Sequence, residues 1–113
     1  LLHAQGTRVV KFFLHISKGY QKDRLLKRLE DPKKHWKFNP DDLAERKRWG
    51  QYKKAYEEAL RRCSTERAPW YVVPAEHRWF RNLLVAQVLV ETRKGMNLHY
   101  PKATFNPRKI VVE

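Results

Sequence analysis

The strongest constraint on the fold is a nearly continuous apolar segment at residues 7–16, which reads TRVVKFFLHI. From Val9 to Ile16 only Lys11 and His15 are polar. A strand with one face in water alternates apolar and polar residues, whereas a strand without that alternation is covered on both faces. We therefore expect residues 7–16 to form a strand of a parallel sheet that is flanked by helices.

A helix is predicted directly after this strand. Ser17 can act as its N-cap and accept a hydrogen bond from a backbone N–H of the first turn. The leucines within residues 25–29 form a narrow apolar stripe. The helix should end at Asp31, because the residue before Pro32 is pushed away from helical backbone angles. In open α/β sheets the ligand crevice lies at the carboxyl ends of the strands, which is where this helix begins.

The segment from His15 to Lys37 is strongly basic, with eight lysines and arginines against three acidic residues. The whole chain has 25 Lys and Arg against 12 Asp and Glu, a formal net charge of +13. Such a surplus attracts polyanions, and arginine can bind a phosphate through two parallel N–H groups. A solvated basic helix without a ligand explains the charge alone equally well.

Composition narrows the classes of protein to which this chain can belong. The chain has 113 residues, of which 42% are hydrophobic, so we expect one folded domain. No apolar run approaches the roughly 20 residues of a membrane-spanning helix, and no signal peptide is visible, so we expect a cytoplasmic protein. The lone Cys63 excludes an internal disulfide, and the five histidines have no metal-ligand spacing.

A second helix is predicted from Asn39 to about Arg62. Asn39 can cap it, and Pro40 suits the first helical position. Its apolar residues recur every three or four positions, which indicates one buried stripe that belongs to the core rather than to a base-stacking surface. The members of the stripe are Trp49, Tyr52, Tyr56, Ala59, Leu60 and Cys63. Charge pairs at a spacing of four should occupy the exposed side, between residues 57–58 and 61–62.

The remaining segments complete an α/β order. Residues 70–73 should form a short strand closed by Pro74. A helix from about Ala75 to Lys94 should follow, with Gly95 just past its end. Its apolar residues spread around the helix, so we expect it to pack deeply. Residues 97–113 should lie across the surface or be partly loose, with a short β-like segment at 110–112.

Residues 1–6 resemble the last turns of a helix that ends at Gly6, so we expect the chain to be cut from a longer protein. Two strands alone cannot form a stable sheet for three helices. We therefore expect either partner strands from further sequence or marginal stability.

Three motifs are similar to those of polyphosphate kinase family 2. They are KFFLHISKGYQKDRLLKRLEDPKKHWKF at 11–38, a helix with Asp42, Tyr52, Ala55 and Tyr56, and STERAPWYVVPA at 64–75. The resemblance covers about residues 6–101 and the second half of the family's domain. It implies the C-terminal part of a P-loop kinase-like three-layer fold, with parallel strands and a helical lid insertion. The implied parts are a helix end and core strand (1–16), the lid region (17–63), a core strand and C-terminal helix (64–96), and the tail (97–113).

The resemblance also implies phosphoryl transfer between inorganic polyphosphate and a nucleoside mono- or diphosphate, with ATP, Mg²⁺ and a homo-oligomer. It leaves the choice between AMP and ADP open. It assigns phosphate binding to Lys18, Arg24, Arg28, Lys34, Lys37 and Arg78. It assigns no catalytic or metal-ligating residue within this chain.

The sequence departs from the family at several positions. Gly19 and Tyr20 stand where acidic residues are common, and Asn82 stands where many members have an arginine, with Arg81 beside it. No Gly-x4-Gly-Lys-[Ser/Thr] motif is present, so the phosphate cradle and the Mg²⁺ aspartates are expected outside this chain, which alone should be inactive. A basic nucleic-acid-binding module and a structural remnant without a ligand are the alternatives.

Overall fold

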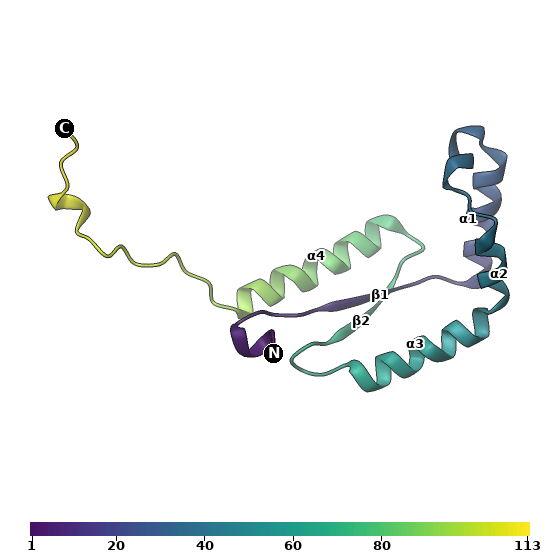
Figure 1. The fold of residues 1–113 in the computed structure, drawn as a ribbon, viewed down its shortest axis with the longest axis horizontal. Coiled ribbons are helices and arrows are strands. Elements are labelled where there is room, and N and C mark those ends of the chain that lie inside the picture. Colours follow the sequence, from purple (N-terminus) through teal and green to yellow (C-terminus); the bar gives the residue numbers. More distant parts are fainter.

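The structure is a computed structural model that describes residues 1–113, with two parallel strands and four α-helices (Figure 1). The expected α/β order with parallel strands is confirmed. In chain order the elements are η1 (His3–Gln5), β1 (Lys11–His15), α1 (Lys18–Glu30), η2 (Pro32–Lys37), α2 (Asp41–Lys47), α3 (Trp49–Cys63), β2 (Trp70–Pro74), α4 (Arg78–Gly95) and η3 (Pro107–Lys109), where η marks a 3₁₀ helix.

The two strands pair in parallel although three α-helices separate them in the sequence. The register runs from Lys11 opposite Trp70 to His15 opposite Pro74. The N–H of Ala75 donates to the carbonyl of His15 over 2.9 Å and extends the pairing by one residue. Since the strands are parallel, both end at the same edge of the sheet, where α1 and α4 begin.

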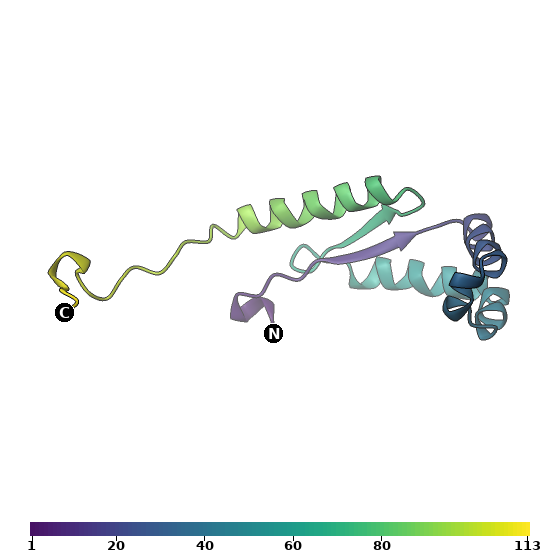
Figure 2. The ribbon, with the colours of Figure 1, turned by 90° about the horizontal axis from the view of Figure 1, so that it is seen from above.

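Helices lie on opposite sides of the two strands. In Figure 2, α4 runs along one side of β1 and β2 and α3 runs along the other. The ring of Phe13 on β1 lies 4.7 Å from the ring of Tyr56 on α3, centroid to centroid. Helices therefore approach the sheet from both faces, as the apolar segment predicts.

The core of this chain is small. Only Leu25, Val73 and Ala75 are buried, and Leu14 on β1 is 47% exposed, so the expected full covering of β1 is not reached. The prediction that α4 packs deeply is wrong, because it has no buried residue and Trp79 is 70% exposed. The physical reason is that two strands cover only one side of an apolar helix. None of the helices combines the length and apolar content that crossing a bilayer requires.

The helix predicted from Asn39 to Arg62 is two helices. The first helix, α2, begins at Asp41, one residue later than predicted, and Pro40 stands at its N-cap position without a side-chain cap. The Oδ1 of Asn39 still accepts from the N–H of Asp41 over 3.0 Å just before the helix. The helix breaks at Arg48, whose backbone angles are −90° and 18°. Its N–H bonds the carbonyl of Glu45 over 2.9 Å, which tightens the last turn of α2. Gly50 follows two residues later. Because glycine is a poor helix former, the series of backbone hydrogen bonds along the helix is easily interrupted here.

The aromatic stripe of α3 is not the buried core that its spacing predicts. Tyr52 and Tyr56 are each 46% exposed, and Cys63 is exposed. Most of the stripe lines an open cavity instead, as Tyr52 and Tyr56 do. On the opposite side, Arg61 and Arg62 both pair with Glu58, at spacings of three and four. Glu57 takes no part in these pairs and faces the cavity.

Three predicted helix boundaries are confirmed. The Oγ of Ser17 accepts from the N–H of Tyr20 over 3.1 Å and caps α1. Asp31 leaves helical geometry, and its carboxylate accepts from the N–H of Lys33 at the start of η2. Gly6 has φ of 85°, a left-handed angle, and its N–H donates to the carbonyl of His3 over 3.0 Å. The tail 97–113 extends away from the strands (Figure 1), and its residues 110–112 form no strand.

The burial of β2 predicts a difference between neighbouring valines. Val73 is 2% exposed and Val72 is 55% exposed. Val73→Ala should lower the free energy of unfolding by about 2 kcal/mol, because buried methyl groups and the resulting cavity both contribute. Val72→Ala is the matched control and should cost less than about 0.5 kcal/mol. Guanidinium unfolding of the purified protein measures both, and equal losses would contradict this account of the core.

Candidate functional site

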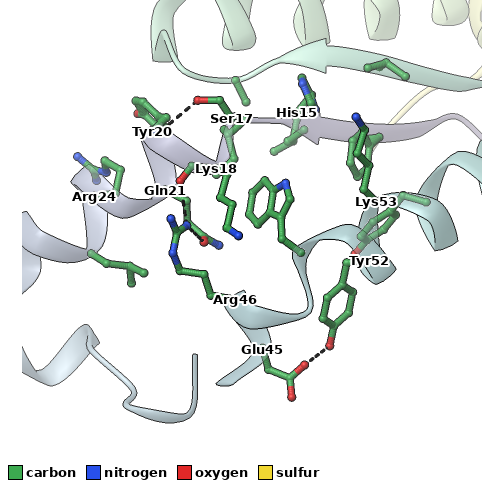
Figure 3. A pocket seen from close by; sticks show the side chains of 18 of the residues that line it. His15, Ser17, Lys18, Tyr20, Gln21, Arg24, Glu45, Arg46, Tyr52 and Lys53 are labelled. Atoms are coloured by element: carbon green, nitrogen blue, oxygen red, sulfur yellow. Dashed lines mark hydrogen bonds between the residues drawn. The ribbon is translucent and has the colours of Figure 1, made fainter. Parts of the chain in front are cut away.

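A cavity of about 1020 Å³ opens at the carboxyl ends of β1 and β2. It is bounded by α1, α2 and α3, which form the connection between the strands, and by the start of α4. Figure 3 shows its side chains, with His15 and Ser17 at the end of β1 and Lys18 extending from α1 toward Arg46 on α2. Parallel pairing therefore places the site, because it brings both strand ends to one edge.

The cavity carries a surplus of positive charge. Three acidic residues line it, namely Asp42, Glu45 and Glu57. All three ion pairs of the structure involve Asp31 or Glu58, neither of which lines the cavity, so none of the cavity's lysines and arginines is neutralised by a carboxylate within 4.0 Å. Unpaired cations in a concave site concentrate the positive potential that attracts anions. The seven lysines and arginines of the lining are Lys18, Arg24, Arg28, Arg46, Lys53, Arg78 and Arg81.

Four of the six predicted phosphate-binding residues meet in this cavity. Lys18, Arg24 and Arg28 come from α1, and Arg78 comes from the first turn of α4. Arg24 and Arg28 are partly buried, lie one helical turn apart and share the side of α1 that faces the cavity. The structure thus brings residues that are 50 to 60 positions apart in the sequence to one cavity.

The other two predicted residues lie outside the lining. Lys34 and Lys37 belong to η2, which follows α1. The Nζ of Lys34 lies 3.5 Å from the carboxylate of Asp31, and the Nζ of Lys37 lies 5.0 Å from the ring centroid of Trp36. A ring nitrogen of His35 lies 2.7 Å from the carbonyl of Leu29, which holds η2 against the end of α1.

Three cations of the lining were not assigned to the site from the sequence. Lys53 lies four residues after Trp49 and three before Tyr56, so helical spacing could have placed it on the side of the aromatic stripe. Arg81 follows Arg78 by three residues and shares its side of α4 in the same way. No sequence signal marks Arg46, because its position depends on how α2 packs against α1.

A carboxylate holds the start of α1. Oε1 of Glu76, which follows β2, accepts from the backbone N–H of Ser17 over 2.8 Å. This bond lowers the pKa of Glu76, since N–H donors stabilise the ionised carboxylate, and His77 and His15 lower it further. Glu76 therefore links the chain after one strand to the helix that follows the other strand, a contact that the sequence did not indicate.

Two hydrogen-bonded contacts connect the helices around the cavity. The Nη1 of Arg46 donates to the carbonyl of Lys18 over 2.8 Å and to the Oε1 of Gln21 over 2.9 Å (Figure 3). Tyr52 on α3 donates its phenol O–H to the carboxylate of Glu45 on α2, across the break between these helices. This bond raises the pKa of Tyr52, because a phenolate would lose the bond and face a negative carboxylate.

The carboxylates of the chain do not form a Mg²⁺ site by themselves. No group of three or more His, Cys, Asp or Glu side chains is arranged to hold a metal ion. Mg²⁺ prefers oxygen ligands in near-octahedral geometry, and the acidic residues of the cavity lining are not clustered in that way.

Known proteins are similar to this chain over all of the residues that line the cavity. The family model of polyphosphate kinase 2 matches residues 1–101. An AMP/ADP-polyphosphate phosphotransferase of Meiothermus ruber is 50% identical over 113 residues, which are 100% of this chain and 42% of that protein. An ADP-polyphosphate phosphotransferase of Rhodopseudomonas palustris is 46% identical over 112 residues, which are 99% of this chain and 39% of that protein.

Solved structures give the same picture. The crystal structure of a polyphosphate kinase 2 from Arthrobacter aurescens superposes with a TM-score of 0.89 at 48% identity, over 95% of this chain and 38% of that chain. The crystal structure of a putative polyphosphate kinase 2 from Pseudomonas aeruginosa superposes with a TM-score of 0.74 at 34% identity, over 79% of this chain and 19% of that chain. The chain spans about two fifths of the length of the first relatives it matches.

The contact between Glu76 and Ser17 predicts a pH dependence. Because the pKa of Glu76 is lowered in the folded protein, its contribution to stability is present above the unfolded pKa of about 4.3 and is lost as the pH falls through the folded pKa. Glu76→Gln should therefore be less stable than the parent protein at neutral pH, and the difference should shrink below pH of about 4.3.

Urea unfolding midpoints between neutral and acidic pH measure this difference. Glu66→Gln is the matched control, because Glu66 is an exposed carboxylate in a loop without a hydrogen bond or ion pair in this structure. A stability difference between the parent and Glu76→Gln that stays constant with pH would contradict the role given to Glu76.

Proposed function

Because the chain belongs to the polyphosphate kinase 2 family, we propose that its cationic cavity binds inorganic polyphosphate during phosphoryl transfer to or from AMP or ADP, with ATP among the nucleotides that take part. One observation carries the proposal: seven lysines and arginines without carboxylate partners line one cavity at the carboxyl edge of two parallel strands. The relatives' names supply the substrate classes, and the cavity supplies the charge that suits them.

Polyphosphate matches this arrangement because it repeats a negative charge at every phosphate. Arginine presents a planar fork that fits phosphate oxygens, and lysine presents a point charge. Arg24 and Arg28 lie one turn apart, about 6 Å along α1, and can bind separate phosphates of one chain. Phosphoryl transfer depends mainly on positioning and on electrostatic stabilisation of the phosphate oxygens. Cations that hold the donor in line are therefore the contribution of this cavity.

The proposal extends to the fold. We assign β1, β2 and α4 to the sheet and helix layers of a P-loop kinase-like three-layer fold, and residues 17–63 to a helical lid. The parallel strands and the helices on opposite sides of them support the layers (Figure 2). The lid leaves the sheet at Ser17 and returns to it before Trp70, and it reaches over the cavity in between. Closure of such a segment removes water that would hydrolyse the phosphate donor.

The proposed part in catalysis is binding rather than complete turnover. The sequence contains no Gly-x4-Gly-Lys-[Ser/Thr] motif, and the structure contains no carboxylate cluster for Mg²⁺. We therefore assign to these residues no step that passes through the metal, and we expect the 113-residue chain alone to bind polyphosphate without transferring phosphate. Self-association is part of the proposal, since Trp79, Leu83 and Val90 form an exposed apolar surface on α4 that a second copy can cover.

Binding measurements on the purified protein test the proposal. Long-chain polyphosphate should bind more tightly than duplex DNA of equal total charge. The logarithm of its affinity should fall linearly with the logarithm of the salt concentration, because binding releases counterions. Tighter binding of DNA would favour a nucleic-acid-binding module, and flat titrations with both polyanions at low salt would favour a remnant without a ligand. Arg24→Lys and Arg28→Lys should each weaken polyphosphate binding by about three- to tenfold, because lysine keeps the charge but loses the fork.

Arg93→Lys is the matched control for these variants. Arg93 is an exposed arginine in the last turn of α4, outside the cavity lining, and its substitution should leave polyphosphate affinity unchanged. Turnover of polyphosphate and ADP, in the form of the protein that is active, provides a second readout. Parental turnover and affinity in both Arg24→Lys and Arg28→Lys would show that these arginines do not clamp phosphate.

Lys34 and Lys37 are assigned to the outer end of the same phosphate path. They lie on η2, which packs against α1 beyond Arg28, and both are exposed. The double change of Lys34→Gln and Lys37→Gln should weaken binding of long-chain polyphosphate by about tenfold and leave tripolyphosphate binding unchanged, because a short chain stays within the cavity.

Lys94→Gln with Lys102→Gln removes the same charge at the far end of α4 and in the tail (Figure 1) and serves as the control. Equal losses for tripolyphosphate and long-chain polyphosphate in the double variant of Lys34 and Lys37 would contradict an outer position on the path.

A further inference from the structure

We propose that Arg46 is a positioning residue that fixes α1 against α2, although its charge and its place in the cavity suggest a phosphate ligand. The inference rests on the proposed function, because the cations that it positions are the proposed phosphate ligands of α1. It concerns the bond between Arg46 and Gln21, to which neither the sequence motifs nor the proposed function gives a role.

The hydrogen bonds of Arg46 occupy the nitrogen that an end-on fork requires. Its Nη1 donates to the carbonyl of Lys18 over 2.8 Å and to the Oε1 of Gln21 over 2.9 Å. One Nη atom of a guanidinium carries two hydrogens, so these two bonds use both of them. The end-on fork formed by Nη1 and Nη2 is therefore unavailable to phosphate. Arg24 and Arg28 make no hydrogen bond through their side chains in this structure, and both of their forks remain available.

The acceptors of Arg46 lie where they set the rotation of α1. Lys18 and Gln21 belong to its first turn, and Gln21, Arg24 and Arg28 follow one another at spacings of three and four. Residues with these spacings share one side of a helix. When Arg46 holds the side chain of Gln21 toward α2, it turns the same side of α1, with both arginines, toward the cavity.

Few other contacts could fix the rotation of α1 about its axis. Leu25 is the only buried residue of α1, and the Glu76 carboxylate holds only the backbone of Ser17 at the start of α1. The neighbouring Glu45 does not compete for the guanidinium, because no ion pair joins them and Glu45 accepts the phenol O–H of Tyr52. The orientation of α1 around its axis therefore depends on the contact between Arg46 and Gln21.

Gln21→Ala tests the inference because it removes the partner of Arg46 without changing any charge. Polyphosphate should bind about tenfold more weakly to this variant, since a hydrogen bond from a charged donor is worth about one power of ten in affinity. Gln51→Ala is the matched control, because Gln51 is an exposed glutamine of α3 outside the cavity lining. Its affinity should equal that of the parent. Adding Arg46→Lys to Gln21→Ala should weaken binding by less than the product of the two single effects, because both changes break the bond between Arg46 and Gln21, although Arg46→Lys also removes the bond to the carbonyl of Lys18.

Two readouts separate this inference from the proposed function. Unchanged or tighter polyphosphate binding by Gln21→Ala, with a parent that binds, would overturn the inference and identify Arg46 as a ligand or a bystander. Absence of binding by the parent would instead reject the proposed function. Hydrogen exchange of the backbone amides of α1 reports the contact without any ligand. Faster exchange in Gln21→Ala than in Gln51→Ala supports the positioning role, and equal exchange overturns it.

Discussion

The parallel pairing of β1 and β2 is the interaction on which the rest of the structure depends. It joins residues 11–15 to residues 70–74 and makes the intervening residues a single long excursion from one edge of the sheet. An antiparallel pair would place the end of β1 and the end of β2 at opposite edges, and α1 and α4 would then start far apart. In the parallel pair, Arg78 and the cations of α1 face the same cavity, and Glu76 can reach Ser17.

Positive charge in the cavity opposes the stability of the chain that carries it. The three ion pairs of the structure lie in η2 and on the outer side of α3, so they do not offset the repulsion among the cavity cations. With three buried residues, this chain has little apolar burial to balance that repulsion. Functional sites commonly retain such an unfavourable arrangement, because an anionic ligand removes the repulsion when it binds.

The sequence predicted local structure better than burial. Ser17, Asp31 and Gly6 act through their own backbone neighbours, so the chemistry of each residue was sufficient to place a helix end. The burial of α4 and of the aromatic stripe of α3 was predicted wrongly, because burial depends on how many strands are present to cover a helix. Family motifs and charge singled out Arg24 and Arg28, which line the cavity, whereas the place of Arg46 in the lining became visible only with the packing of α2 against α1. Contacts between elements that are distant in the sequence are the part that local patterns do not determine.

The interruption at Arg48 has a mechanical consequence. The segment before it is fastened to α1 by the guanidinium of Arg46, whereas the segment after it rests on β1 through Tyr56 and Phe13. A continuous helix would have to bend over its whole length to let one end swing, but here the deformation is concentrated in the torsion angles of residues 48–50. Gly50, which has no neighbouring side chain within 4 Å of where a Cβ would stand, leaves that joint sterically unobstructed. The connection between the strands therefore contains two rigid helices, α2 and α3, that are joined at one hinge. The hydrogen bond from the phenol of Tyr52 to the carboxylate of Glu45 holds this hinge at its present angle.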